Sequence, residues 1–195
     1  MILAFDTETT GFWQDQLPLH HPRQPHMVQL AVVMFDLNVY PYTSEYEAII
    51  RPDGWIIPPE ASAVHGITQE RAVTEGIPLV EIIDRYLGWR KNAHVLVAHN
   101  AEFDIKILAS SIARAGRTLD SRADLKLACT KELATPVIKM SATPRMVASG
   151  RGGQFKPPTL AEAYRHFFQE ELVDAHSALV DAKAVARIYH RLMKP

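Results

Sequence analysis

The first fifty residues contain apolar runs of the length and composition typical of strands. Residues 2–5 are all apolar and predict a short buried strand. Residues 27–35 are apolar almost throughout, which is typical of a central strand covered on both faces, and residues 44–50 predict a third strand. Turn-forming residues occupy positions 36–42. These three successive strands predict an antiparallel meander.

From about residue 58 onward, apolar residues recur at the spacing of amphipathic helices, with strands between them. Short helical segments are expected to begin at Pro58 and at Thr68, separated by the helix-breaking sequence His65-Gly66-Ile67-Thr68. Asn100 and Thr159 are expected to act as helix N-caps. The other expected elements are helices at 79–89, 100–115, 132–134, 159–168 and 175–192, strands at 94–98 and 125–128, and an irregular stretch at 136–158. This order predicts an α/β fold with helices packed on a mixed sheet.

Length and composition indicate one ordinary globular domain. The chain has 195 residues, of which 47% are hydrophobic, so it can bury a sizeable core. We therefore expect a single domain over residues 1–195. No apolar run approaches the roughly 18 residues that span a membrane, and the N-terminus lacks the basic region of a signal peptide. Cys129 is the only cysteine, which fits a reducing cytoplasm.

Two acidic residues follow the first apolar run. Asp6 and Glu8 are two residues apart, so in an extended backbone both side chains project from the same face. Adjacent carboxylates repel each other, and a bound cation is the usual remedy. The alternative is a strand end with two solvated acids. Gly11 then allows the chain to turn.

Three later residues could join this pair. Asp104 lies in the first turn of a predicted helix, where the helix dipole favours a carboxylate, so a local role would also explain it. Asp181 has mainly apolar neighbours in the last predicted helix, and a buried acid without a basic partner favours a metal. His176 and Asp181 would lie about 140° apart on an ideal helix. They can meet only if His176 lies at the frayed start of that helix.

Histidines also occur in the loop at residues 12–26, which is rich in proline, histidine and glutamine. His20, His21 and His26 could suggest a second metal site. We interpret them as solvated loop residues, because no further cysteine or histidine pair has the spacing of ligands.

Three motifs resemble, in order and approximate spacing, the exonuclease motifs of the DEDDh 3′→5′ exonucleases. They are FDTETTG (residues 5–11), HNAEFD (99–104) and HSALVDA (176–182). This group includes the epsilon proofreading subunit of bacterial DNA polymerase III, ribonuclease T and oligoribonuclease. The HGIT sequence at 65–68 is similar to a segment common in epsilon-like members. The resemblance covers essentially the whole chain, and the step of five residues from His176 to Asp181 matches the histidine subclass.

The resemblance implies a ribonuclease H-like fold, with a five-stranded mixed sheet flanked by helices. It implies that two Mg²⁺ or Mn²⁺ ions are held by Asp6, Glu8, Asp104 and Asp181. Oxygen ligands favour these hard cations, and two of them can stabilise the attacking and leaving oxygens of a phosphodiester. His176 would act as the general base, since imidazoles in general titrate near neutrality. The expected substrate-binding residues are Thr7, Thr9, Gly11, Phe12, His65, His99, Asn100 and Phe103, although Phe103 would suit the core as well.

The predicted function is a metal-dependent 3′→5′ exonuclease that acts on a single-stranded or frayed 3′ end of DNA and releases nucleoside 5′-monophosphates. One alternative is an RNA-trimming 3′→5′ exoribonuclease. Another is a catalytically silent nucleic-acid-binding module, which is disfavoured because all five site residues are present.

The sequence departs from the epsilon pattern in its long loop at 12–26 and its long stretch at 136–158. No extension follows the exonuclease core, so a stable polymerase partner is not expected, and the chain resembles compact stand-alone members such as phage-encoded ones. Residues 136–158 carry Lys139, Arg145, Arg151 and Lys156 but no acid, in a chain of net charge −1. We predict a mobile flap that grips the substrate backbone; the alternative is a solvated surface loop.

Overall fold

A computed structural model describes residues 1–194 of the chain, apart from the side chains of residues 39–43. Its centre is a five-stranded sheet in the order β3-β2-β1-β4-β5. The strands are β1 (Ile2–Thr9), β2 (Met27–Asp36), β3 (Val39–Ile49), β4 (Val95–Ala98) and β5 (Lys126–Cys129). β1, β2 and β3 pair antiparallel, whereas β4 and β5 run parallel to β1. The predicted meander and the mixed ribonuclease H-like sheet are therefore confirmed.

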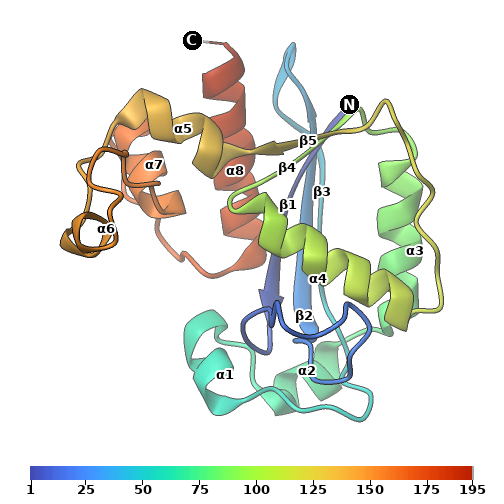
Figure 1. Cartoon of the computed structure of the whole chain (residues 1–195). Helices are drawn as coiled ribbons and strands as arrows, with labels where there is room; N and C mark the ends of the chain where they lie inside the picture. The colour runs from blue at the N-terminus through green and yellow to red at the C-terminus, as the bar shows by residue number, and fades with distance from the viewer. Residues whose placement is uncertain (195) are drawn as a thin grey trace.

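Helices cover both faces of this sheet. Figure 1 shows α3 and α4 on one side of the strands, α8 on the other, and α7 beyond α8. The helices are α1 (Pro59–His65), α2 (Gln69–Glu75), α3 (Leu79–Arg90), α4 (Ala101–Arg114), α5 (Thr130–Ile138), α6 (Pro144–Ala148), α7 (Leu160–Phe168) and α8 (Ala178–Met193). None of the described helices is long and apolar enough to cross a membrane.

The alternation of side chains along β1 divides the core in two. Leu3 and Phe5 are buried in the larger cluster, with residues of α3 and α4. Ile2 and Ala4 point to the other face and pack in a second cluster, with residues of α8. Because successive strand residues face opposite sides, this pattern also decides which helix each polar residue farther along β1 can meet.

The carboxyl end of β1 extends beyond its parallel neighbour. Pairing with β4 covers residues 2–4 of β1, while pairing with β2 continues past Glu8, which lies opposite Gln29, to Thr9 opposite Met27. Residues 6–9 therefore have a strand on one side only. The start of α4 lies beside them, since Thr7 hydrogen-bonds to Asp104 in the first turn of α4.

Several predicted boundaries were wrong. β1 continues to Thr9, so Asp6 and Glu8 lie within the strand, and the turn before β3 occupies only residues 37–38. The last helix begins at Ala178 rather than residue 175. The stretch at 136–158 is not irregular throughout, because it contains the end of α5, the helix α6 and a bridge between Met140 and Lys156.

The predicted N-caps had mixed outcomes. The Thr159 hydroxyl accepts a hydrogen bond from the backbone N–H of Glu162, so this cap is confirmed. Thr68, predicted only to open a helical segment, also caps α2 by accepting from the backbone N–H of Arg71. The side chain of Asn100 makes no cap bond to α4, and its backbone is left-handed with φ of 74°. Its side-chain oxygen instead accepts a hydrogen bond from the ammonium of Lys131.

Candidate active site at the carboxyl end of β1

The strand β1 presents acids on one face and a hydroxyl on the other. Asp6 and Glu8 have the same parity as Ile2 and Ala4, so they point toward the side of the sheet covered by α8. Thr7 has the opposite parity and meets the side covered by α4. The strand geometry therefore aims two carboxylates at α8 and one hydroxyl at α4.

The start of α8 supplies Asp181 and His176. Asp181 is buried in the first turn of the helix. His176 precedes the helix in a left-handed conformation with φ of 70°, and its backbone N–H donates to Asp181 Oδ2 at 3.2 Å. A non-glycine residue rarely adopts this conformation. It places the imidazole outside the helix, which is the arrangement that the sequence required for the two residues to meet.

Asp104 comes from the first turn of α4 on the other side of β1. Its carboxylate is buried and accepts a hydrogen bond from Thr7 Oγ1 at 2.8 Å. This bond joins α4 to β1 at the point where β4 no longer covers the strand. Thr7, which was predicted as a substrate contact, therefore also orients Asp104.

The acids of this site share one electrostatic field. Burial, and then the charges of Asp104, Asp181 and Glu8, raise the pKa of Asp6 well above its ordinary value. Burial raises the pKa of Glu8 to about 8, with Asp181 and Asp104 adding to the shift. Burial also raises the pKa of Asp104 to about 7, against the hydrogen bond from Thr7. For Asp181, burial raises the pKa while the backbone N–H of His176 opposes the change.

This cluster fits a divalent cation. Oxygen or nitrogen atoms from Glu8, His176 and Asp181 all lie within 4.8 Å of one another, and this is the one such group among the described residues. Asp181 Oδ1 is buried and has no hydrogen-bond partner within the described chain. A buried carboxylate oxygen without a partner is costly. A hard cation would both satisfy this oxygen and offset the repulsion between the acids.

Four of the predicted substrate-binding residues surround this end of β1. The Thr9 hydroxyl donates to the backbone oxygen of Gly11 at 2.7 Å, and the adjacent Phe12 is 90% exposed. His65, at the end of α1, is buried, and its Nδ1 accepts from the N–H of Ile67. Its Nε2 has no hydrogen-bond partner in the described part of the chain. Burial lowers the pKa of His65, and the nearby backbone of Thr9 opposes the shift.

His99, Asn100 and Phe103 make contacts within the protein. His99 Nε2 lies 3.1 Å from the carbonyl oxygen of Pro158, and Nδ1 lies 2.9 Å from the hydroxyl of Thr130. Because a carbonyl can only accept, Nε2 carries the proton. Burial lowers the pKa of His99 to about 4, so the ring is neutral near pH 7. Phe103 packs against the larger core cluster.

Two glutamines that were not predicted from the sequence organise the site. Gln29 lies opposite Glu8, and its side chain accepts from the N–H of Ala178, which fixes the start of α8. Gln24 is 1% exposed, and its side-chain amide donates to the carbonyls of Gln14 and Leu17 in the loop at 12–26. The available signal for Gln29 was a polar residue inside an apolar strand. No comparable signal marked Gln24.

His20, His21 and His26 do not form a metal-binding group. His20 is exposed, and His21 Nδ1 accepts from the N–H of Arg23. The His26 ring stacks on Trp55 at 4.7 Å between centroids, and burial lowers its pKa to about 4.

Comparison with known proteins identifies the family. The model of the RNase_T family, described as an exonuclease, matches residues 3–189. The chain belongs to this family. The DEDDh resemblance and the expected enzyme class, an exonuclease, are therefore confirmed, and the DEDDh exonucleases depend on divalent metals.

Curated relatives match parts of this exonuclease region. DNA polymerase III subunit epsilon of Treponema pallidum is 31% identical over 109 residues, which is 56% of this chain and 45% of the relative. An epsilon-like protein of Rhodobacter capsulatus is 33% identical over 119 residues, 61% of this chain and 16% of the relative. A PolC-type DNA polymerase III of Caldanaerobacter subterraneus is 29% identical over 126 residues, 64% of this chain and 8% of the relative. The matched part is thus less than half of each relative.

Solved structures share the fold. Exonuclease I of E. coli in complex with a dT13 oligonucleotide superposes with a TM-score of 0.75 at 15% identity, covering 99% of this chain and 41% of that one. The nuclease domain of 3′hExo, a DEDDh family member bound to rAMP, gives a TM-score of 0.68 at 14% identity, with 99% and 91% covered. At these identities, the likeness establishes the ribonuclease H-like fold alone.

Proposed function

We propose that this chain is a divalent-metal-dependent 3′→5′ exonuclease that removes nucleoside 5′-monophosphates from the 3′ end of DNA. The observation that carries the proposal is that Glu8, His176 and Asp181 come together with an unpartnered oxygen on Asp181, while Asp6 lies close enough to Asp104, Asp181 and Glu8 for their charges to raise its pKa. The match of the exonuclease family over residues 3–189 supports a single exonuclease domain.

In this proposal, Asp6, Glu8 and Asp181 would hold one Mg²⁺ or Mn²⁺, and Asp6 and Asp104 would hold a second. When bound, the two ions would neutralise the charge that develops on the attacking and leaving oxygens. Thr7 keeps the Asp104 carboxylate oriented through its hydrogen bond. The raised pKa values of the acids favour the protonated forms without metal, so metal binding would release protons.

His176 is proposed as the general base. It is exposed at the edge of the cluster, and its ring is within 4.8 Å of carboxylate oxygens of Glu8 and Asp181. The ring takes a proton from the attacking water while the oxygen of that water bonds to phosphorus. The bond from phosphorus to the 3′-oxygen breaks, and that oxygen takes a proton from solvent. The products are a nucleoside 5′-monophosphate and a strand with a new 3′-hydroxyl.

The terminal nucleotide is proposed to bind between Phe12 and His65. Phe12 is 90% exposed next to the turn that follows β1, and an exposed aromatic side chain is a stacking surface for a base. His65 Nε2 is buried near the backbone of Thr9 and makes no hydrogen bond of normal geometry within the described chain, so we propose that it binds a polar group of the nucleotide. Thr9 and Gly11 hold the intervening turn through their own hydrogen bond.

The test uses 5′-labelled and 3′-labelled strands of DNA and RNA with Mg²⁺, Mn²⁺ or EDTA. A 3′→5′ exonuclease releases labelled mononucleotide at once from the 3′-labelled strand and progressively shortens the 5′-labelled strand. We expect this with either metal and no reaction in EDTA. Cleavage that starts at the 5′ end would contradict the direction, and absence of metal-dependent cleavage would favour the silent binding module.

DNA is proposed as the substrate because all three curated relatives are DNA polymerase III proteins or are named as similar to one of its subunits. The alternative is RNA, since a structural neighbour is bound to rAMP. A higher kcat/KM on RNA than on DNA of the same sequence would reverse the assignment.

A further inference from the structure

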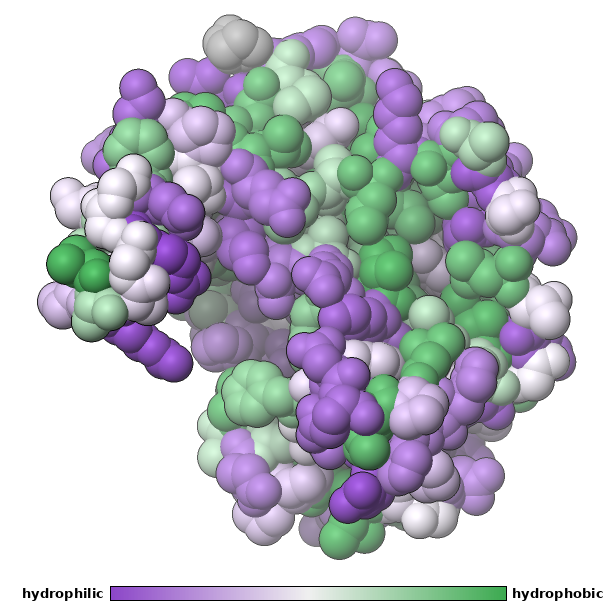
Figure 2. Space-filling model, viewed as in Figure 1, coloured by the Kyte–Doolittle hydropathy of each residue, from purple (hydrophilic) through white to green (hydrophobic). Residues whose placement is uncertain are grey.

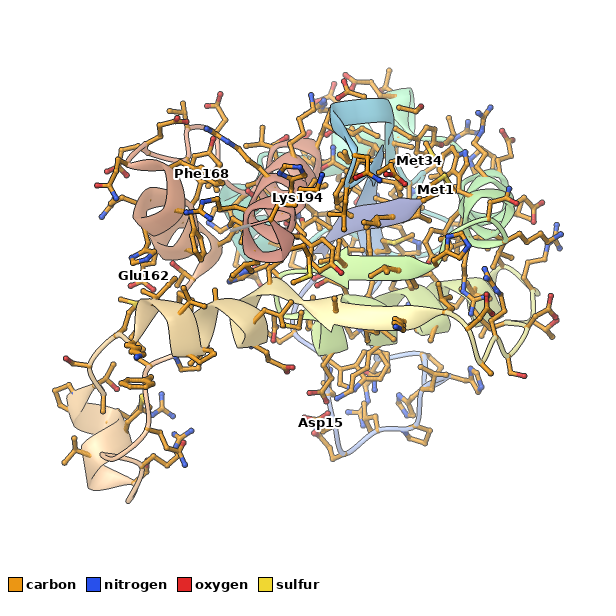
Figure 3. All side chains as sticks on the ribbon, turned by 90° about the horizontal axis from the view of Figure 1, so that it is seen from above. Met1, Asp15, Met34, Glu162, Phe168 and Lys194 are labelled. Carbon is orange, nitrogen blue, oxygen red and sulfur yellow. The ribbon has the colours of Figure 1, made fainter. Side chains whose placement is uncertain are left out.

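Residues 136–158, called the arm from here on, project from the body of the molecule. Figures 1 and 3 show the segment with α6 standing away from the sheet, beyond α5. Its two halves are joined where the N–H of Lys156 donates to the carbonyl of Met140 at 3.0 Å. Met146 is the one buried residue of α6, at 8% exposure. The arm is thus an ordered projection with little packing of its own.

The base of the arm is fixed beside the acid cluster. His99 joins the C-terminal end of the arm to the start of α5, the helix from which the arm departs, with Pro158 on one ring nitrogen and Thr130 on the other. His99 directly follows β4, and β4 pairs with β1, which carries Asp6 and Glu8. One side chain therefore holds the last residue of the arm and the start of α5 near the carboxyl end of β1.

The arm concentrates positive charge. It carries four of the 21 basic residues of the chain and none of the 22 acidic ones. Lys156 is used internally, because its ammonium pairs with Glu162 next to the Thr159 cap of α7. Lys139, Arg145 and Arg151 are exposed, and none of them makes an ion pair within the described chain.

The arm also exposes an aromatic side chain in the same segment as these cations. Phe155 is 46% exposed and lines a shallow groove with Gln154, Pro157 and residues of α5. Cations together with an exposed aromatic ring are the combination that single-stranded nucleic acid requires, since phosphates meet the cations and a base stacks on the ring. Figure 2 shows a hollow between the arm and the lobe formed by α1 and α2.

We propose that the arm binds the substrate strand on the 5′ side of the scissile bond. Lys139, Arg145 and Arg151 contact its phosphates, and Phe155 stacks with one of its bases. The proposal rests on the proposed exonuclease function, because it assumes that the 3′ end of the strand occupies the acid cluster. The strand would leave that cluster through the hollow beside the arm. The arm contacts mainly the phosphate backbone of a single strand, so its affinity for the strand should not depend on the base sequence.

The test measures binding of a fluorescent single strand of about 20 nucleotides, longer than a typical single-strand site, in Ca²⁺ to prevent cleavage. The variant replaces Lys139, Arg145 and Arg151 with alanine. Each phosphate contact on a single strand contributes about 0.7 to the slope of log affinity against log salt. We expect the variant to bind more weakly and its slope to be smaller by about 2. Equal slopes for wild type and variant would overturn the proposal.

A matched control removes three exposed cations at the opposite end of the sheet. Lys91, Lys126 and Arg191 are exposed, and Lys126 pairs with Val95, at the end of β4 far from the site. The variant Lys91→Ala/Lys126→Ala/Arg191→Ala has the same net charge as the arm variant. We expect it to retain the wild-type slope. If the slope of log affinity against log salt fell equally in both triple variants, the change would reflect net charge alone, and the arm would not be a specific contact.

Two further variants test the arm by reversing two of its charges and by removing its exposed aromatic ring. Arg145→Glu/Arg151→Glu should weaken binding more than removal of the same two cations by alanine, because the new carboxylates repel phosphate. Phe155→Ala should weaken binding about 5-fold or more with no change in salt slope. Circular dichroism of each variant checks the fold. A charge reversal without effect in a folded variant would also contradict the proposal.

A small chromogenic phosphodiester separates this proposal from the proposed function. Such an ester is too short to reach the arm, so its metal-dependent hydrolysis by the wild-type chain reports the acid cluster alone. Hydrolysis of the ester together with an unchanged salt slope in the arm variant would overturn the arm and keep the exonuclease. Absence of hydrolysis of both ester and strand by the wild type would overturn the proposed function itself.

Discussion

The acid cluster and the arm hold opposite charges by opposite means. Asp104 and Asp181 are buried and belong to helices packed on the two faces of the sheet. Lys139, Arg145 and Arg151 are exposed on a projection whose helix α6 has one buried residue. Catalytic acids must be placed within fractions of an ångström, and burial provides this at the cost of repulsion. Phosphate contacts act through charge at longer range, so exposed and loosely packed side chains suffice.

This contrast predicts that removal of a single charge has a much larger effect on function in the acid cluster than in the arm. In the cluster, loss of a single charge should remove activity. In the arm, loss of a single charge should change affinity only slightly. Substitutions in each region test this difference, from the largest expected effect to the smallest.

The largest effect is expected from Asp6→Asn and Asp181→Asn. Each change keeps the volume of the side chain but removes a charged metal ligand. Metal stabilisation of the transition state is worth several kcal/mol, so we expect kcat to fall by at least about 10³-fold. The measurement is release of mononucleotide from a 3′-labelled strand in excess Mg²⁺. Asp15→Asn, in an exposed loop acid, is the matched control and should retain the wild-type rate; near-normal turnover by either cluster variant would refute the metal assignment.

A smaller loss is expected from His176→Ala. A general base contributes about 10²–10⁴-fold, and kcat should fall by that amount. Because a protonated imidazole cannot accept a proton, wild-type activity should decline toward acidic pH, and the variant should lose this limb of the profile. The measurement is the pH–rate profile at saturating Mg²⁺. His20→Ala, in another exposed histidine, should leave the profile unchanged. A His176→Ala profile identical to wild type would move the base elsewhere.

The contrast also explains which features were predictable from the sequence. The five proposed site residues could be selected from the sequence because each lies in a short motif, and because strand parity places Asp6 and Glu8 on one face. The antiparallel meander and the mixed sheet followed from three successive strands and two later strands that alternate with helices. These are local or periodic signals, and the structure agrees with them.

The features that were missed depend on contacts between distant residues. Asn100 has the residue type of an N-cap, but its left-handed backbone directs the side chain to Lys131, in α5. His99 resembled a substrate contact, and nothing local shows that Thr130 and Pro158 occupy both of its nitrogens. Composition identified the arm as basic, but it could not show that Lys156 forms an ion pair with Glu162. This pairing depends on how the arm returns to α7.

A third prediction concerns stability without metal. Burial raises the pKa of Glu8 to about 8 and that of Asp104 to about 7, above the values of about 4 in an unfolded chain. Near neutral pH, the folded chain therefore holds protons that the unfolded chain has lost. The free energy of unfolding falls as pH rises through this range and is lowest above about pH 8. His26 and His99 have pKa values of about 4 in the folded chain. Above pH 7 they are neutral in both the folded and the unfolded chain, so they add little to the pH dependence of the free energy of unfolding.

We expect the Tm in EDTA to drop by about 4–8 °C between pH 6.5 and 8.5. Mg²⁺ should recover most of this loss, because it binds the charged carboxylates of the folded chain only. Glu8→Gln should flatten the dependence and raise the Tm at the higher pH. The measurement is thermal denaturation by circular dichroism in both buffers. A Tm that rises with pH in EDTA would show that the acids are not mutually destabilised.

The smallest effect is expected at the junction between the two regions, from His99→Ala. The change removes two hydrogen bonds and leaves the Pro158 carbonyl and the Thr130 hydroxyl without their ring partner. A neutral hydrogen bond contributes about 1 kcal/mol, so the free energy of unfolding should fall by about 1–3 kcal/mol, allowing for the cavity that the ring leaves. The acids do not depend on these bonds, whereas the placement of the arm does. KM for a long strand should therefore rise while kcat changes less than about threefold.

Hydrogen exchange in His99→Ala should become faster in α6 and at the Met140–Lys156 pairing, but not in β1. His94→Ala, in an exposed histidine at the other end of β4, is the control. If His99→Ala lowered kcat as strongly as His176→Ala, His99 would belong to the catalytic site rather than to the base of the arm.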